Sequence, residues 1–282
     1  MNVRFFTFGR YHGKDNIPGS THIRVNQLLK YWPEAGLYKY GENPDALIFQ
    51  KVYVTPDYKF PLHFEGIKIL DICDPDWLDD AAIVETCNAM DAVVTPTEAI
   101  ASFIRQFHNN VVVIPDRFDL ETIPEPKEHT NPAEYVAWFG YAHNSILLKP
   151  AMPVLEDLHL KLILVADDDP IPDKWGNRRR EDFYTFVKYN ESTIYQELQK
   201  ADFVVLPEGA RPIDIYKSNN KTIKANLAGL PVARNADDVH LYMDARERKK
   251  WLDSNYEIIC KEYDVRKSVE QYKQLINQVS NR

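Results

Sequence analysis

The sequence alternates short apolar runs with segments of helical length, and this alternation limits the possible folds more than any other feature. In the first part of the chain, runs rich in Val, Ile and Phe occupy residues 3–8, 46–54, 67–72, 92–96 and 111–115. Segments of helical character lie between them at residues 20–32, 78–90 and 97–107. Buried strands that alternate with helices are typical of a parallel sheet covered by helices. This part of the chain is therefore predicted to form an α/β domain.

A polar stretch with three prolines, residues 116–132, interrupts the alternation and has the composition of an interdomain linker. Beyond it, apolar runs that predict strands occupy residues 135–140, 161–166, 183–187, 203–206 and 230–233. Helices are expected at residues 145–158, 193–200 and 218–228. The predicted fold class is therefore α/β, with two Rossmann-like domains at residues 1–124 and 125–261 that face a central cleft.

The end of the chain, residues 262–282, is an amphipathic segment. Its apolar side chains follow helical spacing at positions 265, 269, 272, 275, 276 and 279. Such a face has to be covered by other apolar groups, so we expect this helix to pack back on the first domain.

Composition excludes several classes of protein. The net charge of −8 argues against a surface built mainly to bind nucleic-acid phosphates, although it leaves room for a local basic cleft. No run approaches the roughly 18 apolar residues of a membrane span, and no signal-peptide pattern follows Met1, so a cytoplasmic location is expected. Three cysteines without CxxC spacing predict neither a disulfide framework nor a zinc site.

Loops that follow the strands are the expected ligand sites, because ligands bind at the carboxyl ends of strands in such sheets. The loop after the first strand contains Gly9, Gly13 and Gly19, and glycines let the backbone approach a ligand closely. Their spacing is not that of a dinucleotide fingerprint. Gly9 is therefore a candidate ligand-binding residue, and a long loop that binds no ligand is the alternative.

A second loop follows the strand that ends at Gly140. His143 and Asn144 lie where the next helix is expected to begin, and the unpaired amides of a helix start suit a phosphate. Asn144 can equally be a simple helix cap. These residues are candidates for binding a phosphate-bearing ligand.

A third loop leads into the helix expected at residues 218–228. Lys217 and Lys221 flank Ser218, Asn219 and Asn220 there. Helix-start amides together with two lysines make a cradle for a diphosphate. In the alternative interpretation, Ser218 only caps the helix and the lysines are solvated.

In the first domain, Asp71, Asp74 and Asp76 lie at the end of the strand expected at residues 67–72. Clustered carboxylates can orient sugar hydroxyls, bind a metal or act as a base. Asp76, just before Trp77, is the best candidate of the three for contact with a substrate, and a helix cap is its alternative role.

Several of these segments resemble, in the same order, the retaining GT-B glycosyltransferases of the large family four. Residues 135–144 resemble the first strand and donor loop of that family, residues 201–209 its penultimate strand and residues 217–235 its donor helix. Residues 90–104 and 111–119 resemble the passage that leads into its linker. The resemblance covers roughly residues 71–235. It implies an enzyme that moves a hexosyl or pentosyl group from a nucleotide-sugar, with a UDP-sugar favoured, with retention and without a metal ion or obligatory cofactor.

The resemblance also implies roles for single residues. Gly140, His143 and Asn144 would face the donor phosphates, and the amides of residues 218–220 would hold the diphosphate with Lys221. Tyr189 would lie near the nucleobase, and Glu208 would border the sugar. With Asp74 and Asp76, taken from the strand end described above, the candidate catalytic residues are Lys221, Asp74, Asp76 and Glu208. Asp76 is the best candidate for contact with the acceptor.

The sequence departs from this family at a pair of glutamates, which are replaced by Tyr216 and Lys224. The second of them normally holds the donor ribose. Asp116 stands in place of the usual asparagine, and the chain is short for the family. With these departures, the sequence fits a divergent Lys-Ser-x-x-Lys subgroup of the family better than its core members. The identity of the donor nucleotide stays open.

Other functions fit the same residues. The first is a viral-type glycosyltransferase acting on hydroxymethylpyrimidines in DNA, which is also a small GT-B protein. The second is an inactive sugar-nucleotide-binding protein, which the absence of the glutamate pair would explain. A sugar-nucleotide epimerase is a third. The acceptor is accordingly a glycan, a small molecule or modified DNA.

Overall fold

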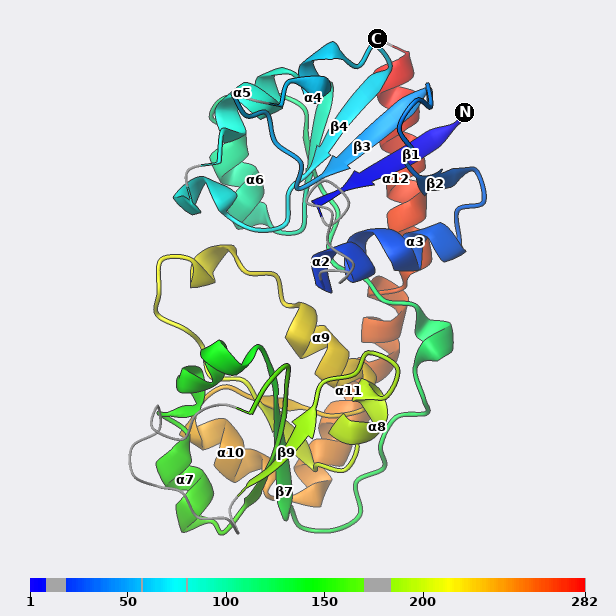
Figure 1. Ribbon diagram of the computed structural model, residues 1–282. Coiled ribbons are helices and arrows are strands. Elements are labelled where there is room, and N and C mark those ends of the chain that lie inside the picture. The colour runs from blue at the N-terminus through cyan, green and yellow to red at the C-terminus, as the bar shows by residue number, and fades with distance from the viewer. Residues whose placement is uncertain (9–18, 57, 80, 170–183, 282) are drawn as a thin grey trace. The chain divides into compact units, whose positions relative to one another are not determined.

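The protein divides into two units in the computed structural model, which describes residues 1–8, 19–56, 58–79, 81–169 and 184–281 (Figure 1). The first unit comprises Met1–Asp119, Arg211–Ser218 and Tyr263–Arg282, and the second Leu120–Ala210 and Asn219–Glu262. The sequence placed residues 211–218 with the second half. They group with the first unit because they contact its side chains, as described below.

The first unit is built on one parallel sheet. Its strands are β1 (Val3–Thr7), β2 (Ala35–Leu37), β3 (Ala46–Gln50), β4 (Ile67–Asp71), β5 (Ala92–Thr95) and β6 (Val111–Val113). They pair in the order β2-β1-β3-β4-β5-β6, and every pairing is parallel. All residues of β3 are buried, as expected for a strand covered on both faces. The strand order reverses between β1 and β3, so their carboxyl ends form the switch point of this sheet.

Helices cover both faces of this sheet. They are α2 (Gly19–Thr21), the π-helical turn η1 (His22–Asn26), α3 (Gln27–Lys30), α4 (Phe60–His63), η2 (Asp76–Asp79), α5 (Ile83–Asn88), α6 (Glu98–Ile104) and α12 (Val265–Ser280). Phe5 and Ile48 face one core with Trp32 and Tyr272 of α12. Phe6, Leu47 and Phe49 point to the opposite core, beside α4, α5 and α6. Figure 1 shows α3 and α12 on one face and α4–α6 on the other. This division follows from the two-residue period of a strand.

The second unit contains a second parallel sheet. Its strands are β7 (Tyr135–Gly140), β8 (Lys161–Ala166), β9 (Tyr184–Lys188), β10 (Phe203–Val205) and β11 (Val232–Ala233). They pair in the order β11-β10-β7-β8-β9, which is the Rossmann order when the strands are counted along the chain. The order reverses between β7 and β10. The loops after these two strands therefore lie at the ligand-binding end of the sheet.

The remaining helices are η3 (Leu120–Thr122), η4 (Ala142–Leu148), α7 (Met152–Asp157), α8 (Ile194–Leu198), η6 (Asp214–Tyr216), α9 (Asn220–Leu227), α10 (Ala236–Tyr242) and α11 (Ala245–Glu262). Helix α9 ends at Leu227, and Gly229, two residues later, has a φ of +83°, in the left-handed region that glycine favours. A Cβ there would lie 2.4 Å from the amide nitrogen of Lys127. The glycine is thus required both for the turn and for the close approach of the linker.

The two helix-covered parallel sheets confirm the predicted α/β class with two Rossmann-like domains. The helix expected at residues 145–158 is instead two pieces, η4 and α7, because Pro150 cannot continue a helix and Pro153 lies at the start of α7. The helix expected at residues 78–90 is also two pieces, and its regular part begins at Ile83, which is buried, whereas Leu78 is exposed. In the part of the chain that the structure describes, no helix is long and apolar enough to cross a membrane.

Candidate functional site

Two of the predicted donor-binding residues meet at the carboxyl end of β7. Gly140 has a φ of +153°, and a Cβ added there would lie 3.3 Å from the Nζ of Lys221. The same Nζ lies 5.6 Å from the centre of the Trp138 ring, which is cation–π range. The first turn of α9 therefore presents its lysine to the end of the central strand, next to the switch point of the sheet. Trp138 was not predicted as part of the site.

The loop after β7 forms η4 rather than a regular helix. The rings of Tyr141 and His143 stack with centroids 5.7 Å apart, and both side chains are exposed. The amide of Ala142 donates to the carboxylate of Asp167 at 2.6 Å, and the amide of Asn144 donates to the Tyr141 carbonyl at 2.8 Å. The first amides of η4 thus have partners within the protein. His143 and Asn144 lie at the expected place, beside an aromatic surface.

A second positive side chain, Arg234, lies beside the first turn of α9 and was not among the predicted site residues. Arg234 follows β11, and its guanidinium lies 3.1 Å from the Thr222 hydroxyl and 3.3 Å from a carboxylate oxygen of Glu208. Glu208, which was predicted to border the sugar, is largely exposed. Arg234 therefore holds Glu208 near the first turn of α9. Its position just after a strand was a signal that could have identified it.

Lys224, one of the departures from the family pattern, is buried in the same helix. Its Nζ donates to a carboxylate oxygen of Glu191 at 2.7 Å and to the Tyr189 hydroxyl at 3.1 Å. Burial lowers the pKa of Lys224, and Glu191 opposes that shift. Burial also raises the pKa of Tyr189, and the neighbouring Glu191 carboxylate adds to the rise. Tyr189, predicted near the nucleobase, is thus part of a polar cluster at the end of β9.

The predicted cradle of residues 217–221 is divided between the two units. Lys217 donates from its Nζ to Asp74 at 2.7 Å, and the Ser218 hydroxyl donates to Asp116 at 2.6 Å, all within the first unit. Asn219, Asn220 and Lys221 belong to the second unit. Asn219 is the N-cap of α9, and its side chain makes no capping hydrogen bond to the helix.

Asp74 and Asp76 lie together in the first unit, as predicted, and share a cation. The Nζ of Lys51 lies 2.9 Å from Asp74 and 3.2 Å from Asp76, and the Tyr53 hydroxyl donates to Asp76. Burial alone would raise the pKa of Asp74, but Lys51 and Lys217 outweigh it and lower the pKa. Burial raises the pKa of Asp76 against the opposing effect of Lys51. Lys51 and Tyr53 follow β3, so the rule of carboxyl strand ends could have identified them.

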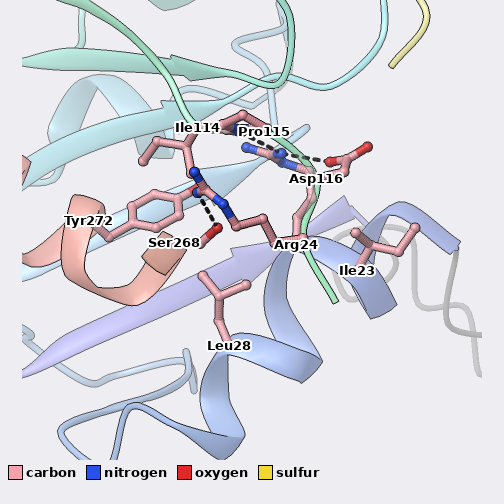
Figure 2. Close-up of a pocket in the computed structure, with 9 residues that line it drawn as sticks. Ile23, Arg24, Leu28, Ile114, Pro115, Asp116, Ser268 and Tyr272 are labelled. Atoms are coloured by element: carbon pink, nitrogen blue, oxygen red, sulfur yellow. Dashed lines mark hydrogen bonds and ion pairs between the residues drawn. The ribbon is translucent and has the colours of Figure 1, made fainter. Parts of the chain in front are cut away.

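Asp71 was expected beside these two carboxylates, and that expectation is wrong. It is fully buried and accepts hydrogen bonds from Arg24 at 2.7 Å and from the Tyr272 hydroxyl at 2.8 Å. Arg24 also donates to Asp116 at 2.8 Å, and Figure 2 shows these two residues at the edge of a small cavity bordered by α12. Among the described residues, the second terminal nitrogen of Arg24 finds no acceptor. Asp71 therefore belongs to a buried ionic network.

Gly9, the candidate ligand-binding residue of the loop after β1, lies outside the described residues. Among the residues that the structure does describe, no three His, Cys, Asp or Glu side chains are placed to hold a metal ion together.

The protein is similar to several solved structures of glycosyltransferases. No protein-family model and no curated protein matches the chain. Among solved structures, the T4 phage β-glucosyltransferase in complex with UDP-glucose is similar with a TM-score of 0.61 and 11% identity, covering 98% of this chain and 99% of that one. AviGT4, a glycosyltransferase of avilamycin A biosynthesis, matches with a TM-score of 0.58 and 12% identity over 99% and 98% of the two chains.

A third similar structure is TarM from S. aureus, in a complex that contains UDP, with a TM-score of 0.59 and 17% identity. The match covers 82% of this chain but 55% of TarM, so the chain spans about half the length of that protein. Likeness at these identities establishes the fold. The chain has the GT-B fold of two Rossmann-like domains, as the sequence resemblance implied.

Proposed function

We propose that the protein is a glycosyltransferase that moves a sugar from a nucleoside diphosphate, with a UDP-sugar as the favoured donor. The observation that carries the proposal is the meeting of Gly140 and Lys221 at the switch point of the second sheet. A glycine without a side chain, a lysine and the amino end of a helix together favour a diphosphate. The similar structures that were solved in complex with UDP or UDP-glucose support this assignment.

In this proposal, Lys221 and the first amides of α9 stabilise the charge that develops on the leaving diphosphate. Fixed positive groups aimed at a leaving group lower the barrier, because the negative charge is greatest in the transition state and product. Arg234 adds a second cation beside Thr222. We propose that no metal ion is required and that the sugar keeps its anomeric configuration, with the acceptor attacking on the face that the diphosphate leaves.

The acceptor is proposed to bind at Asp76. A carboxylate held by Lys51 and Tyr53 can orient an acceptor hydroxyl and accept its hydrogen bond. The raised pKa of Asp76 makes it the better proton acceptor of the pair, while two lysines keep Asp74 ionised.

The proposal is tested by incubating the protein with UDP-, GDP-, ADP- and dTDP-sugars and following binding and hydrolysis by mass spectrometry. Tight binding of one donor and its slow hydrolysis are expected. Failure to bind any of these donors would contradict the proposal. Binding without hydrolysis or transfer to any acceptor would favour a sugar-nucleotide-binding protein that is not an enzyme.

Replacing Asp76 with asparagine is expected to lower sugar transfer about 100-fold while leaving donor affinity unchanged, because the carboxylate acts on the acceptor. The measurement is the transfer rate at saturating donor, together with the donor dissociation constant from calorimetry. Asp79→Asn is the matched control, since Asp79 is an exposed residue of the same η2 turn. Wild-type transfer by the Asp76 variant would refute the assignment of the acceptor site.

Modified DNA is a second candidate acceptor. The chain and the T4 phage DNA-modifying β-glucosyltransferase cover each other by 98% and 100% with a TM-score of 0.62 and 10% identity, so they share the GT-B fold. The net charge of −8 opposes extensive phosphate contact. Incubation with a donor and hydroxymethylated or unmodified DNA distinguishes this acceptor, because only the hydroxymethylated duplex would gain a sugar.

A further inference from the structure

The middle of α9 contains a charged group that is out of place in a helix packed on a sheet. Lys224 is 6% exposed, and its ammonium group is held by Glu191, which is 35% exposed. The rings of Tyr189 and Tyr195 lie 5.7 and 5.9 Å from the same nitrogen. A buried ammonium group lowers stability unless it is well compensated, and an apolar side chain would fill the space with less loss. The arrangement therefore calls for a role other than stability.

The effect of this cluster is to fix one carboxylate. The Nζ of Lys224 donates to Oε1 of Glu191, and the Tyr189 hydroxyl donates to Oε2. A carboxylate offers about four acceptor positions, so it can accept further hydrogen bonds while both donors stay in place. Because Glu191 is partly exposed, hydroxyl groups of a ligand can reach its carboxylate.

Helix α9 links Glu191 to the proposed diphosphate site through Lys224 and Lys221. Lys221 and Lys224 are three residues apart on α9, which puts their side chains on one face roughly 5–6 Å apart at Cβ. Lys221 lies against Gly140 at the end of β7, and Lys224 donates to the hydroxyl of Tyr189 just after β9. The carboxyl ends of β7 and β9 and the first two turns of α9 therefore form one strip. Along it, a cation at Lys221 is followed by a fixed carboxylate at Glu191.

In a nucleoside diphosphate, the ribose directly follows the phosphates and carries two neighbouring hydroxyl groups. We propose that Glu191 accepts hydrogen bonds from these two ribose hydroxyls, and that Lys224 is the positioning residue that fixes its carboxylate. This inference rests on the proposed function and narrows the donor class to ribonucleoside diphosphates. A 2′-deoxy donor lacks one of these hydroxyls and therefore loses one hydrogen bond to the Glu191 carboxylate, so it binds more weakly.

The test is calorimetric titration with the best-binding ribonucleoside diphosphate among UDP, GDP and ADP, and with its 2′-deoxy form. The wild-type protein is expected to prefer the ribose form about tenfold. Glu191→Gln and Lys224→Met are expected to bring the ratio of the two dissociation constants close to one. The double variant E191L/K224M replaces both charges with apolar groups, so it removes the carboxylate without leaving an unpaired buried lysine. Thermal melting confirms that each variant is folded.

Glu197→Gln is the matched control, because Glu197 also pairs with a lysine, Lys200, in the same unit. It should keep the tenfold preference. A wild-type ratio in both Glu191→Gln and E191L/K224M would overturn the inference, as would equal binding of the two nucleotides by the wild-type protein. The proposed function fails separately, if the wild-type protein binds none of the nucleoside diphosphates.

Discussion

Replacing Lys221 with alanine is expected to lower the rate of sugar transfer by about 100-fold to 1,000-fold, which is the usual effect of removing one preorganised donor from a developing negative charge. Lys221 lies against Gly140 and over Trp138, so its ammonium group is held at the end of the central strand. The measurement is the transfer rate at saturating donor, together with the affinity for the free diphosphate. Both should fall, and the rate should fall further because charge on the leaving group is greatest in the transition state.

Two other lysines serve as comparisons. Lys200→Ala should leave transfer unchanged, because Lys200 is exposed and pairs with Glu197 in the neighbouring turn. Lys217→Ala tests whether Lys217 binds the diphosphate together with Lys221, as the predicted cradle requires. Lys217 groups with the first unit and pairs with Asp74, so its loss should weaken diphosphate binding less than the loss of Lys221. Unchanged turnover and affinity in Lys221→Ala would refute the diphosphate site.

Much of the fold could be predicted because strand signals are local. The apolar runs at residues 135–140 and 161–166 coincide with β7 and β8, since buried parallel strands need continuous apolar sequence. The assignment of residues 211–218 to the first unit could not be predicted. It depends on contacts such as Lys217 with Asp74 and Ser218 with Asp116, which join residues 143 and 102 positions apart.

The candidate site shows the same limit. The rule of carboxyl strand ends made Gly140 and Asp76 candidates, because it depends only on where a strand stops. It misplaced Asp71, because burial against Arg24 and Tyr272 is decided by η1 and α12, which are distant in sequence. Lys224 was noticed only as a departure from a pattern. Its partner Glu191 lies 33 positions away in another loop, and no local signal connects the two.

Replacing Arg24 with methionine is expected to lower the free energy of unfolding by about 3–5 kcal/mol, the usual loss when one partner of a buried ion pair is removed. Arg24 is 3% exposed and contacts Asp71 and Asp116, which would both remain in the interior without their cation. Urea unfolding, followed by fluorescence and circular dichroism, measures the change. Lys30→Met is the control, because Lys30 is 45% exposed in its pair with Asp119 and should contribute at most about 1 kcal/mol.

The loss caused by Arg24→Met should depend on pH. Burial already raises the pKa of Asp71 in the native protein, against the opposing effect of Arg24, and removal of Arg24 takes that opposition away. The variant's folded state then binds a proton on Asp71 more readily than its unfolded state does, so its stability rises as the pH falls toward the pKa of the folded carboxyl. The difference from wild type should therefore be smaller at about pH 5 than at about pH 7. A difference that stays constant over this range would mean that lost packing, rather than an uncompensated charge, is the cause.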